Sequence, residues 1–261
     1  MAAPAAVAVT LPQIAKMIDH SLLHPTMTDR EILAGLEMAK KYKVAAACVK
    51  PYSIPVAKDA LDGSGVLICA VIGFPHGNST TTVKVLEAEE AVKSGAHELD
   101  MVVNVGKVLG GDWEYVTNEI RAINDTVVKR GAILKVIFEN DYLRDEDITY
   151  LCKICTSLSV AFVKTSTGFG FVKQPNGSYA YKGATGSHLK LMKANVGPNV
   201  QIKAAGGIRS LDEVMGAISL GVTRIGTSST ETIIEEAIHR GINTPMGFAL
   251  VSPVDPHRST F

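Results

Sequence analysis

Short runs of apolar residues alternate with amphipathic segments along almost the entire chain. The runs are rich in Val, Ile and Ala, and their hydrophobicity is nearly continuous. They lie at residues 17–23, 45–50, 66–75, 97–103, 133–139, 160–165, 200–207 and 222–229. Short, continuous runs of this kind are typical of parallel strands buried on both faces, so the pattern predicts eight such strands.

The segments between these runs carry the start and stop signals of helices. Thr28 with Glu31, and Ser210 with Glu213, have the spacing of a capping box, and Gly221 ends the second of these two helices. The apolar periodicity predicts further helices at 80–94, 113–129, 145–157, 185–195 and 229–240, and a short one near Leu11–Met17.

Strands and helices that alternate over about 240 residues match one (β/α)₈ barrel, a TIM barrel of the α/β class. The doubly wound alternative predicts a glycine-rich turn after the first strand, whereas DHSLLHPTMTD (19–29) contains no glycine. We therefore expect a single TIM-barrel domain over residues 1–261 with a short extra N-terminal helix. About 1–10 and 245–261 are expected to be peripheral tails.

Charge and hydropathy narrow the class of partner. The chain has 26 basic and 26 acidic residues, so its formal net charge is zero. A nucleic acid or an anionic membrane as the main partner would favour a basic excess, so we expect neither. No run is long and apolar enough to cross a membrane, and the N-terminus lacks the positive region of a signal peptide. The expected location is the cytoplasm.

Two candidate metal or redox motifs have simpler interpretations. Cys152-x-x-Cys155 shares an apolar helical face with Ile148, and no second cysteine pair completes a zinc site, so both cysteines are interpreted as packing residues. His20 and His24 are four residues apart, but they lie on a predicted strand and its loop, where that spacing does not bring them together. A hydrogen-bonded structural role is therefore favoured over a metal site.

Ionisable residues interrupt several of the apolar runs. They are Asp19, Lys50, Asp100, Lys135, Glu139, Lys164 and Lys203. The C-terminal ends of barrel strands meet at one mouth, where the chemistry of this fold takes place. A single charge of this kind is often half of a buried ion pair, but so many at one mouth indicate an active site. Because the Gly-x-Ser-x-Gly motif is absent, lysine becomes the candidate reactive group.

Lys164 is the candidate nucleophile. It follows the apolar run 160–163, which partly desolvates its amine, and Lys203 lies on the next predicted strand. Two ammonium groups about 5 Å apart repel by about 3 kcal/mol at an effective dielectric constant near 20, which corresponds to roughly two pKa units. Lys203 is therefore the candidate flanking cation, and Asp100 is the candidate group that accepts and returns protons. Together they predict carbonyl chemistry through a Schiff base.

Two glycine-bearing loops after the last two predicted strands indicate a phosphate site. One contains Gly206 and Gly207, and the other contains Gly226 followed by Ser228 and Ser229. Glycine lets backbone N–H groups approach a ligand, helix N-termini attract anions, and these two loops commonly bind phosphate in barrels. The alternative for each loop alone is ordinary turn chemistry. Further candidate donors from the neighbouring loop are Thr165, Thr167 and Gly168.

Four motifs of this chain are also informative as a set. They are FVKTSTGFG (162–170), KAAGGIR (203–209), ELDMVVN (98–104) and ACVKPYS (47–53). Together they closely resemble the deoxyribose-phosphate aldolase family of metal-independent class I aldolases, and the resemblance extends from about Ile14 to Ile238. It implies an imine on Lys164, with proton transfer by Lys203 and Asp100. It also implies the substrate 2-deoxy-D-ribose 5-phosphate, cleaved reversibly to D-glyceraldehyde 3-phosphate and acetaldehyde without a cofactor or metal.

The resemblance also suggests further site residues and shows two departures. It places Lys135 and Asp19 in the polar network of the site, and Cys48 at the wall of the pocket. Phe169 stands where certain members carry a lysine near the phosphate, so one cationic contact is missing. Phe261 stands where some members end in a tyrosine, and it could cover the site but could not relay a proton.

Several functions remain open from the sequence. The expected partner is a small phosphorylated sugar, and a homodimer is one option for the assembly. The nearest alternative is another Schiff-base phosphosugar lyase or a transaldolase-like enzyme. A phosphate-binding isomerase or synthase would use the lysines only to neutralise an anion. A barrel that senses a ligand without catalysis would lack one of the catalytic residues, yet Asp100, Lys164 and Lys203 are all present.

Overall fold

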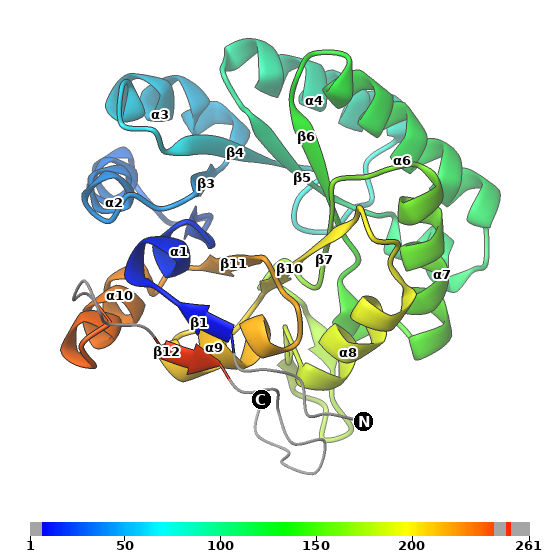
Figure 1. Ribbon diagram of the computed structural model, residues 1–261. Helices are drawn as coiled ribbons and strands as arrows, with labels where there is room; N and C mark the ends of the chain where they lie inside the picture. The colour runs from blue at the N-terminus through cyan, green and yellow to red at the C-terminus, as the bar shows by residue number, and fades with distance from the viewer. Residues whose placement is uncertain (1–6, 243–248, 252–261) are drawn as a thin grey trace.

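Eight parallel strands close into a barrel in the computed structural model, which describes residues 7–242 and 249–251 (Figure 1). Each barrel strand pairs with the next one along the chain, and β11 pairs with β2 to complete the ring. All eight predicted strands and the predicted TIM barrel are confirmed. The strands are β2 (Ile18–Leu22), β3 (Ala46–Val49), β4 (Leu67–Ile72), β5 (Glu98–Val102), β6 (Ile133–Ile137), β7 (Phe162–Lys164), β10 (Gln201–Ala205) and β11 (Arg224–Thr227).

Helices between the strands form the outer layer around the barrel (Figure 1). Both predicted capping boxes are present, at the start of α2 and of α9. The short N-terminal helix α1 is also confirmed. The helices are α1 (Leu11–Ala15), α2 (Asp29–Lys41), α3 (Ile54–Leu61), α4 (Thr81–Ser94), α5 (Val105–Leu109), α6 (Trp113–Val128), α7 (Asp145–Ser157), α8 (Gly186–Asn195), α9 (Leu211–Ser219) and α10 (Thr230–His239), with 3₁₀ turns η1 (Pro51–Ser53) and η2 (Asn140–Tyr142).

Some short elements are absent from the sequence-based prediction. Helices α3 and α5 have only eight and five residues, too few for an apolar periodicity to repeat. Between β7 and α8, strands β8 (Val172–Lys173) and β9 (Tyr179–Ala180) form a small antiparallel hairpin. Its residues are mostly exposed, so no alternation of buried and polar positions marks it in the sequence.

The two ends of the described chain pair with each other. Strand β1 (Val7–Val9) runs antiparallel to β12 (Ala249–Val251), as a two-stranded sheet separate from the barrel. These strands fall within the segments expected to be peripheral tails. Of these expected tails, residues 1–6, 245–248 and 252–261, the last of which is Phe261, lie outside the described residues.

Strand register gathers the ionisable residues inside the barrel. Lys203 on β10 lies opposite both Lys164 on β7 and Arg224 on β11. Asp100 on β5 lies opposite Lys135 on β6. Side chains alternate between the two faces of a strand, so residues in register share a face. Asp100, Lys135, Lys164 and Lys203 therefore point to a common interior.

The apolar side chains form a large core and a small one. The large core fills the space between the barrel and its helices, and it includes Cys152 and Cys155 of α7. Both cysteines are buried and unbridged, which confirms the packing interpretation of this motif. No helix in the described ranges has the length and apolar character needed to span a membrane. The small core lies on the β3 and β4 side of the barrel and comprises Leu23, Ala46, Cys48, Cys69 and Val71.

Candidate active site

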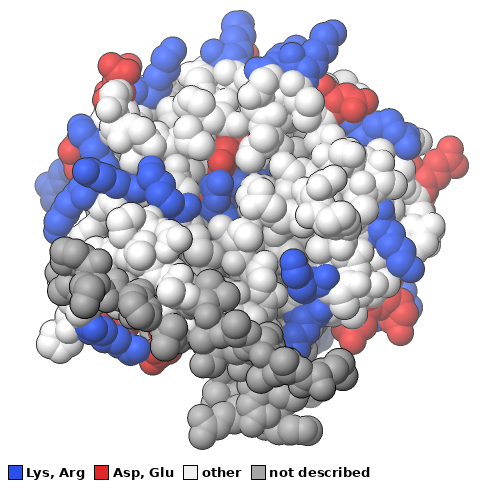
Figure 2. All heavy atoms as spheres, in the orientation of Figure 1, with Lys and Arg blue, Asp and Glu red and all other residues white. Residues whose placement is uncertain are grey.

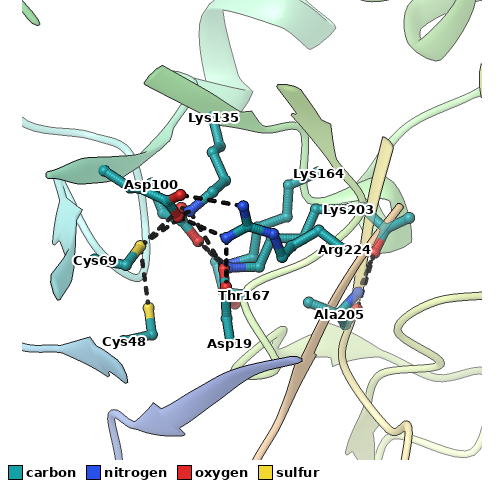
Figure 3. A network of polar contacts seen from close by, with 12 residues as sticks. Asp19, Cys48, Cys69, Asp100, Lys135, Lys164, Thr167, Lys203, Ala205 and Arg224 are labelled. Atoms are coloured by element: carbon teal, nitrogen blue, oxygen red, sulfur yellow. Dashed lines mark hydrogen bonds and ion pairs between the residues drawn. The ribbon is translucent and has the colours of Figure 1, made fainter. Parts of the chain in front are cut away.

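Asp100 lies at the centre of a set of ion pairs inside the barrel (Figure 3). Its Oδ2 accepts hydrogen bonds from Lys164 Nζ at 2.7 Å and from Lys203 Nζ at 2.8 Å. Its Oδ1 accepts one from Lys135 Nζ at 2.9 Å. The three predicted catalytic residues therefore lie together, and Lys135 contacts the other oxygen of Asp100.

A second group of charged side chains contacts the first. Asp19 on β2 accepts from Lys203 Nζ through Oδ2 and from Arg224 Nη1 through Oδ1, the latter at 2.7 Å. Glu98 on β5 pairs with both Arg224 and Lys135 at 2.7 Å. We call the connected side chains the barrel cluster. Its members are Asp19, Glu98, Asp100, Lys135, Lys164, Lys203 and Arg224.

Sequence reasoning missed two members of the barrel cluster, Glu98 and Arg224. Both stand at the first position of their strands, away from the C-terminal ends where chemistry was sought. The period of two along a strand carried the signal, because Glu98 is two residues before Asp100 and so faces the same interior. Arg224 precedes Gly226 by the same interval. These residues anchor the base of the cluster.

Burial and charge oppose each other in the barrel cluster. Burial alone would raise the pKa of Asp100, but Lys135, Lys164 and Lys203 outweigh it and hold that pKa well below its usual range. Burial alone would lower the pKa of Lys203, but Asp100 and Asp19 raise it above its usual value. Asp100 therefore stays ionised and Lys203 stays protonated at neutral pH.

Asp100 weakens the repulsion between Lys164 and Lys203 that the sequence predicts. In the structure both amines donate to Asp100 Oδ2, which offsets much of that repulsion. The barrel cluster still holds more cations than carboxylates, since three lysines and an arginine face two aspartates and one glutamate. One positive charge is therefore in excess when all members are ionised.

A cavity of about 500 Å³ opens above the barrel cluster. Among the described residues that line it, Lys164 is the single member of the cluster. Lys164 is 2% exposed, whereas Lys203 and Asp100 are fully buried beneath it. A ligand in the cavity can therefore reach the Lys164 amine directly, and the other cluster members act on it from below.

Most of the residues expected to bind phosphate lie at the cavity wall. Gly206 and Gly207 have φ of 92° and 89°, a left-handed backbone that favours glycine. The built position of a Gly168 Cβ is 3.9 Å from Gly206 Cα, so the loops after β7 and β10 face each other closely. The expected residues that line the cavity are Thr167, Gly168, Gly206, Gly207, Gly226 and Ser228.

Two of the expected binding residues, Thr165 and Ser229, are not part of the cavity wall. The Thr165 hydroxyl is used within the protein: it donates to the Ala205 carbonyl at 2.9 Å and accepts from the Ala205 N–H at 3.0 Å. These bonds tie the ends of β7 and β10 together. Ser229 stands before α10, where its N–H donates to the Thr227 hydroxyl at 2.9 Å. The structure thus gives both residues roles in shaping the loops.

The cavity also has lining residues that the sequence analysis did not single out. Arg209 follows the Gly206-Gly207 pair and brings a permanent positive charge to the wall. Tyr181, just after β9, and Thr227, at the end of β11, line the cavity as well. Arg209 was contained in the quoted KAAGGIR motif. Its position two residues after a glycine pair, just before a helix start, was the available signal.

Comparison with known proteins agrees with this geometry. A model of the DeoC/LacD family of aldolases matches residues 13–236. A deoxyribose-phosphate aldolase of Rhodopirellula baltica is 46% identical over 224 residues, which cover 86% of this chain and 89% of that one. One of Treponema denticola is 40% identical over 222 residues, covering 85% and 98%. A solved structure of the enzyme from Aeropyrum pernix, a tetramer, has a TM-score of 0.76 and 30% identity over 86% of this chain and 91% of that one.

The chain belongs to the DeoC/LacD aldolase family. It is therefore an enzyme of the aldolase class, a carbon–carbon lyase. Figure 2 shows acidic and basic side chains together in a hollow at the centre of one face of this aldolase, surrounded by mostly uncharged surface. Because the view is that of Figure 1, the hollow lies where the barrel strands converge.

Phe169 of the aldolase belongs to an apolar wall. Its ring packs edge-on against Phe74, with ring centroids 5.6 Å apart, and tilts against His24 at 6.2 Å. Both phenylalanines pack on the small core that contains Leu23 and Val71. Phe169 thus extends the apolar side of the barrel interior to the cavity wall. The positive charge that a lysine would bring here comes to the wall from Arg209 instead.

The remaining candidate residues lie beneath or beside the cavity. Asp19 and Lys135 are buried in the barrel cluster, and Cys48 lies beside it with its Sγ 3.7 Å from Cys69 Sγ. None of these three lines the cavity among its described wall residues. Lys50 stands apart from the cluster, because its amine donates to the His24 carbonyl at 3.0 Å.

The histidines and the buried donor groups offer little to a metal. His20 Nδ1 lies 2.8 Å from the Thr230 hydroxyl, and His24 Nδ1 lies 2.7 Å from the Thr26 hydroxyl, which supports the structural role expected for both. Burial lowers the pKa of His20 to about 4. Cys48, Cys69 and Asp100 converge, but ammonium groups already bind Asp100 and would repel a metal ion.

Proposed function

We propose that this aldolase reversibly cleaves 2-deoxy-D-ribose 5-phosphate to D-glyceraldehyde 3-phosphate and acetaldehyde through an imine on Lys164. The observation that carries the proposal is the position of Lys164: it is the cluster lysine that lines the cavity, and its amine shares Asp100 with Lys203. The relatives named deoxyribose-phosphate aldolase, at 40% and 46% identity over most of the chain, support the choice of substrate.

The choice of Lys164 over Lys203 as nucleophile rests on access and charge. Lys203 is fully buried and donates to two carboxylates, Asp19 and Asp100, which raise its pKa. It therefore remains a cation that cannot attack a carbonyl. Lys164 donates to one carboxylate and faces the cavity, so its amine is the one that a ligand's aldehyde can reach.

In the first step, the neutral Lys164 amine adds to C1 of the open-chain sugar. Loss of water from the resulting carbinolamine gives a protonated imine, in which the C=N bond replaces the C=O bond. Asp100 holds Lys164 Nζ in place at 2.7 Å. Lys164 thereby becomes an electron sink for the next step.

Bond cleavage follows at C2–C3 of the imine. The proton of the C3 hydroxyl passes through a water molecule to the Asp100 and Lys203 pair, and the C2–C3 electrons move towards the iminium nitrogen to form an enamine. D-Glyceraldehyde 3-phosphate leaves. Because the pKa of Asp100 is far below its usual range, the carboxylate does not retain the proton, which can return to C2 of the enamine. Hydrolysis of the new imine releases acetaldehyde and restores Lys164.

In this proposal, the phosphate of the substrate binds at the side of the cavity formed by the glycine loops, away from the Lys164 amine. Backbone N–H groups near Gly206, Gly207 and Gly226 approach the cavity without side chains in the way, and Arg209 contributes a positive charge. Ser228 is exposed at the wall and offers a hydroxyl. This arrangement anchors the sugar by one end while its aldehyde end meets Lys164.

Borohydride trapping tests the proposal. The protein is incubated with 2-deoxyribose 5-phosphate, or with acetaldehyde, and borohydride, and the modified peptide is identified by mass spectrometry. A secondary amine on Lys164 is expected with both ligands, together with release of D-glyceraldehyde 3-phosphate in a coupled assay. A stable adduct on Lys203, or no adduct on any lysine, would contradict the mechanism. If another phosphosugar forms the Lys164 adduct and is cleaved faster, that sugar would replace 2-deoxyribose 5-phosphate as the proposed substrate.

A further inference from the structure

Glu139 is a buried carboxylate outside the barrel cluster, directly after β6. It is 2% exposed, and its backbone adopts the left-handed conformation with φ 60° and ψ 61°. A residue with a Cβ pays a steric cost in this region, and such strain persists where the surroundings hold the residue in place. Glu139 is one of the charges expected at the barrel mouth from the sequence, and it has no role in the proposed mechanism.

The carboxylate of Glu139 is turned towards the loop that follows Lys164. Both carboxylate oxygens lie 3.3 Å from the Thr167 N–H, and Oε2 also accepts a short hydrogen bond from the Thr167 hydroxyl. The backbone on either side of Glu139 holds the same segment: Phe138 N–H donates to the Lys164 carbonyl, and Asn140 N–H donates to the Thr165 carbonyl, both at 3.0 Å. Glu139 is thus the side-chain part of a continuous link between β6 and this loop.

The contact with Glu139 is passed on to the cavity wall. The Thr167 hydroxyl, which donates to Glu139, also accepts from the Phe169 N–H at 2.9 Å. Thr167, Gly168 and Phe169 all line the cavity. Gly168 lies between the two residues that this hydrogen-bond chain fixes, and it packs against Gly206, with 3.9 Å from its built Cβ position to Gly206 Cα.

We propose that Glu139 is a positioning residue for the phosphate end of the substrate: its ionised carboxylate holds the 165–169 loop so that Gly168 stays packed against Gly206 in the wall that receives the phosphate. The role rests on the proposed function of the cavity. Glu139 itself does not line the cavity, and its side chain is not bonded to Lys164. It acts on the cavity through its hydrogen bonds with Thr167.

The ionisation of Glu139 sets the pH range of this role. Burial raises its pKa to about 7, the hydrogen bonds from Thr167 oppose that rise, and the neighbouring charges are Asp141 in η2 and Lys164 at the end of β7. Tyr181 is a further titratable neighbour, because both its Cβ and Glu139 Oε1 face Gly170. Above this pKa the carboxylate accepts both Thr167 donors, and below it one oxygen becomes a donor itself. We therefore expect KM for the phosphorylated substrate to rise as the pH falls below about 7.

The variant Glu139→Gln tests the proposal by splitting kcat from KM. Steady-state kinetics are measured between pH 6 and pH 9 with 2-deoxyribose 5-phosphate and with unphosphorylated 2-deoxyribose. At pH 8 we expect KM for the phosphorylated sugar to rise by about tenfold, with kcat and the KM for the unphosphorylated sugar within about twofold of wild type. The part of the rise in KM below pH 7 that comes from protonation of Glu139 should be absent in the variant.

A matched control separates this effect from titration of the substrate itself, whose phosphate titrates near pH 6. Glu87 of α4 is a half-buried carboxylate that accepts from the Gly73 N–H at 2.7 Å at the end of β4, and burial raises its pKa as well. It does not line the cavity. Glu87→Gln should keep the wild-type pH profile and the wild-type preference for the phosphorylated sugar.

Thr167 provides a second route if Glu139→Gln folds poorly. Thr167→Val removes the hydroxyl that donates to Glu139 and should reproduce the rise in KM. Thr167→Ser keeps this hydroxyl and should have the wild-type KM. A pH profile and a phosphate preference that survive both Glu139→Gln and Thr167→Val would overturn the role of Glu139. Borohydride trapping on Lys164 at saturating substrate should persist in these variants. Its absence in the wild-type enzyme would refute the proposed function instead, so the two failures are distinguishable.

Discussion

Lys84 and Lys164 are both buried lysines, but their surroundings give them opposite roles. Lys84 on α4 is fully buried and donates to the Val102 carbonyl at 2.8 Å and to Glu119 at 2.9 Å. Glu119 in turn accepts from the Asn104 N–H. This pair joins α4 and α6 to the end of β5. Every polar group has a partner there, and neither charge lines the cavity.

Lys164 instead competes for its partner. It shares Asp100 with Lys135 and Lys203, in a cluster where cations outnumber carboxylates, and its amine reaches the cavity. Burial of a lysine is thus not in itself a sign of chemistry. What separates the two sites is an unbalanced local charge together with access for a ligand.

The pKa directions at the two sites show the same contrast. At Lys84, burial outweighs the carboxylates of Glu119 and Glu87, and the pKa of the lysine falls. At Lys203, burial is outweighed by Asp100 and Asp19, and the pKa of the lysine rises. The two carboxylates in direct contact with the Lys203 amine thus hold it as a cation, which suits a fixed positive charge beside the reactive amine.

The largest effect on activity is expected from Lys164→Met. The variant cannot form the imine, so kcat should fall by at least about 10⁴-fold, as is typical when a covalent nucleophile is lost. The coupled assay for glyceraldehyde 3-phosphate measures the loss, and borohydride trapping should give no adduct. Stability in urea should change little, because Asp100 keeps two other amine partners. Turnover within about tenfold of wild type would mean that another residue is the nucleophile.

Lys84→Met is the corresponding change at the structural site. It leaves Glu119 buried without its cation, so we expect unfolding in urea to show a loss of about 3–5 kcal/mol. At 25 °C the folded fraction should retain wild-type kcat. The double variant Lys84→Met with Glu119→Leu removes both charges and should recover most of the stability. A selective loss of kcat in the single variant would show that the two sites are not separate.

Much of the barrel could be predicted because its signals are local. Parallel strands buried on both faces appear as continuous apolar runs, and the capping boxes at Thr28 and Ser210 mark helix starts with side-chain chemistry. The hairpin of β8 and β9 could not be predicted in this way. Its exposed residues follow no apolar period, and the segment directly after it is held by another loop: Asp141 of η2, after β6, accepts from the Lys182 and Gly183 N–H groups.

The site was predictable where strand position alone decides which residues meet. Lys164 ends its strand, Asp100 and Lys203 stand at the middle of nearby strands, and barrel geometry brings the three together. The bridging of both amines by a single Asp100 oxygen depends on side-chain packing, which strand order does not reveal. For the same reason, the link between Glu139 and Thr167 required the fold.

Lys203→Leu is expected to reduce kcat by about 10²- to 10³-fold by removing a fixed cation beside the reacting groups. Lys203 is one of three lysines that lower the pKa of Asp100, so that pKa should rise in the variant. Asp100 would then take up a proton at a higher pH, and the acidic limb of the pH–rate profile should move to higher pH. Lys203→Arg keeps the charge and should recover part of the activity. An unchanged acidic limb would separate Asp100 from the rate-limiting proton transfer.

The smallest of these effects is expected from Arg209→Ala, which tests the cavity wall opposite Lys164. Arg209 is exposed, so solvent weakens its attraction for an anion, and we expect KM for 2-deoxyribose 5-phosphate to rise by about tenfold, or about 1.4 kcal/mol. KM for unphosphorylated 2-deoxyribose should stay the same, because no charge is lost from its contacts.

Arg240→Ala is the matched control for Arg209→Ala, since Arg240 pairs with Asp212 and Glu236 and does not line the cavity. It should leave both KM values unchanged. If Arg209→Ala raises KM for both sugars equally, the arginine shapes the loop after β10 without contacting the phosphate. If it raises neither, the backbone N–H groups of the glycine loops hold the phosphate without help from a side-chain cation. In that case the absence of a lysine at Phe169 costs the enzyme no binding energy.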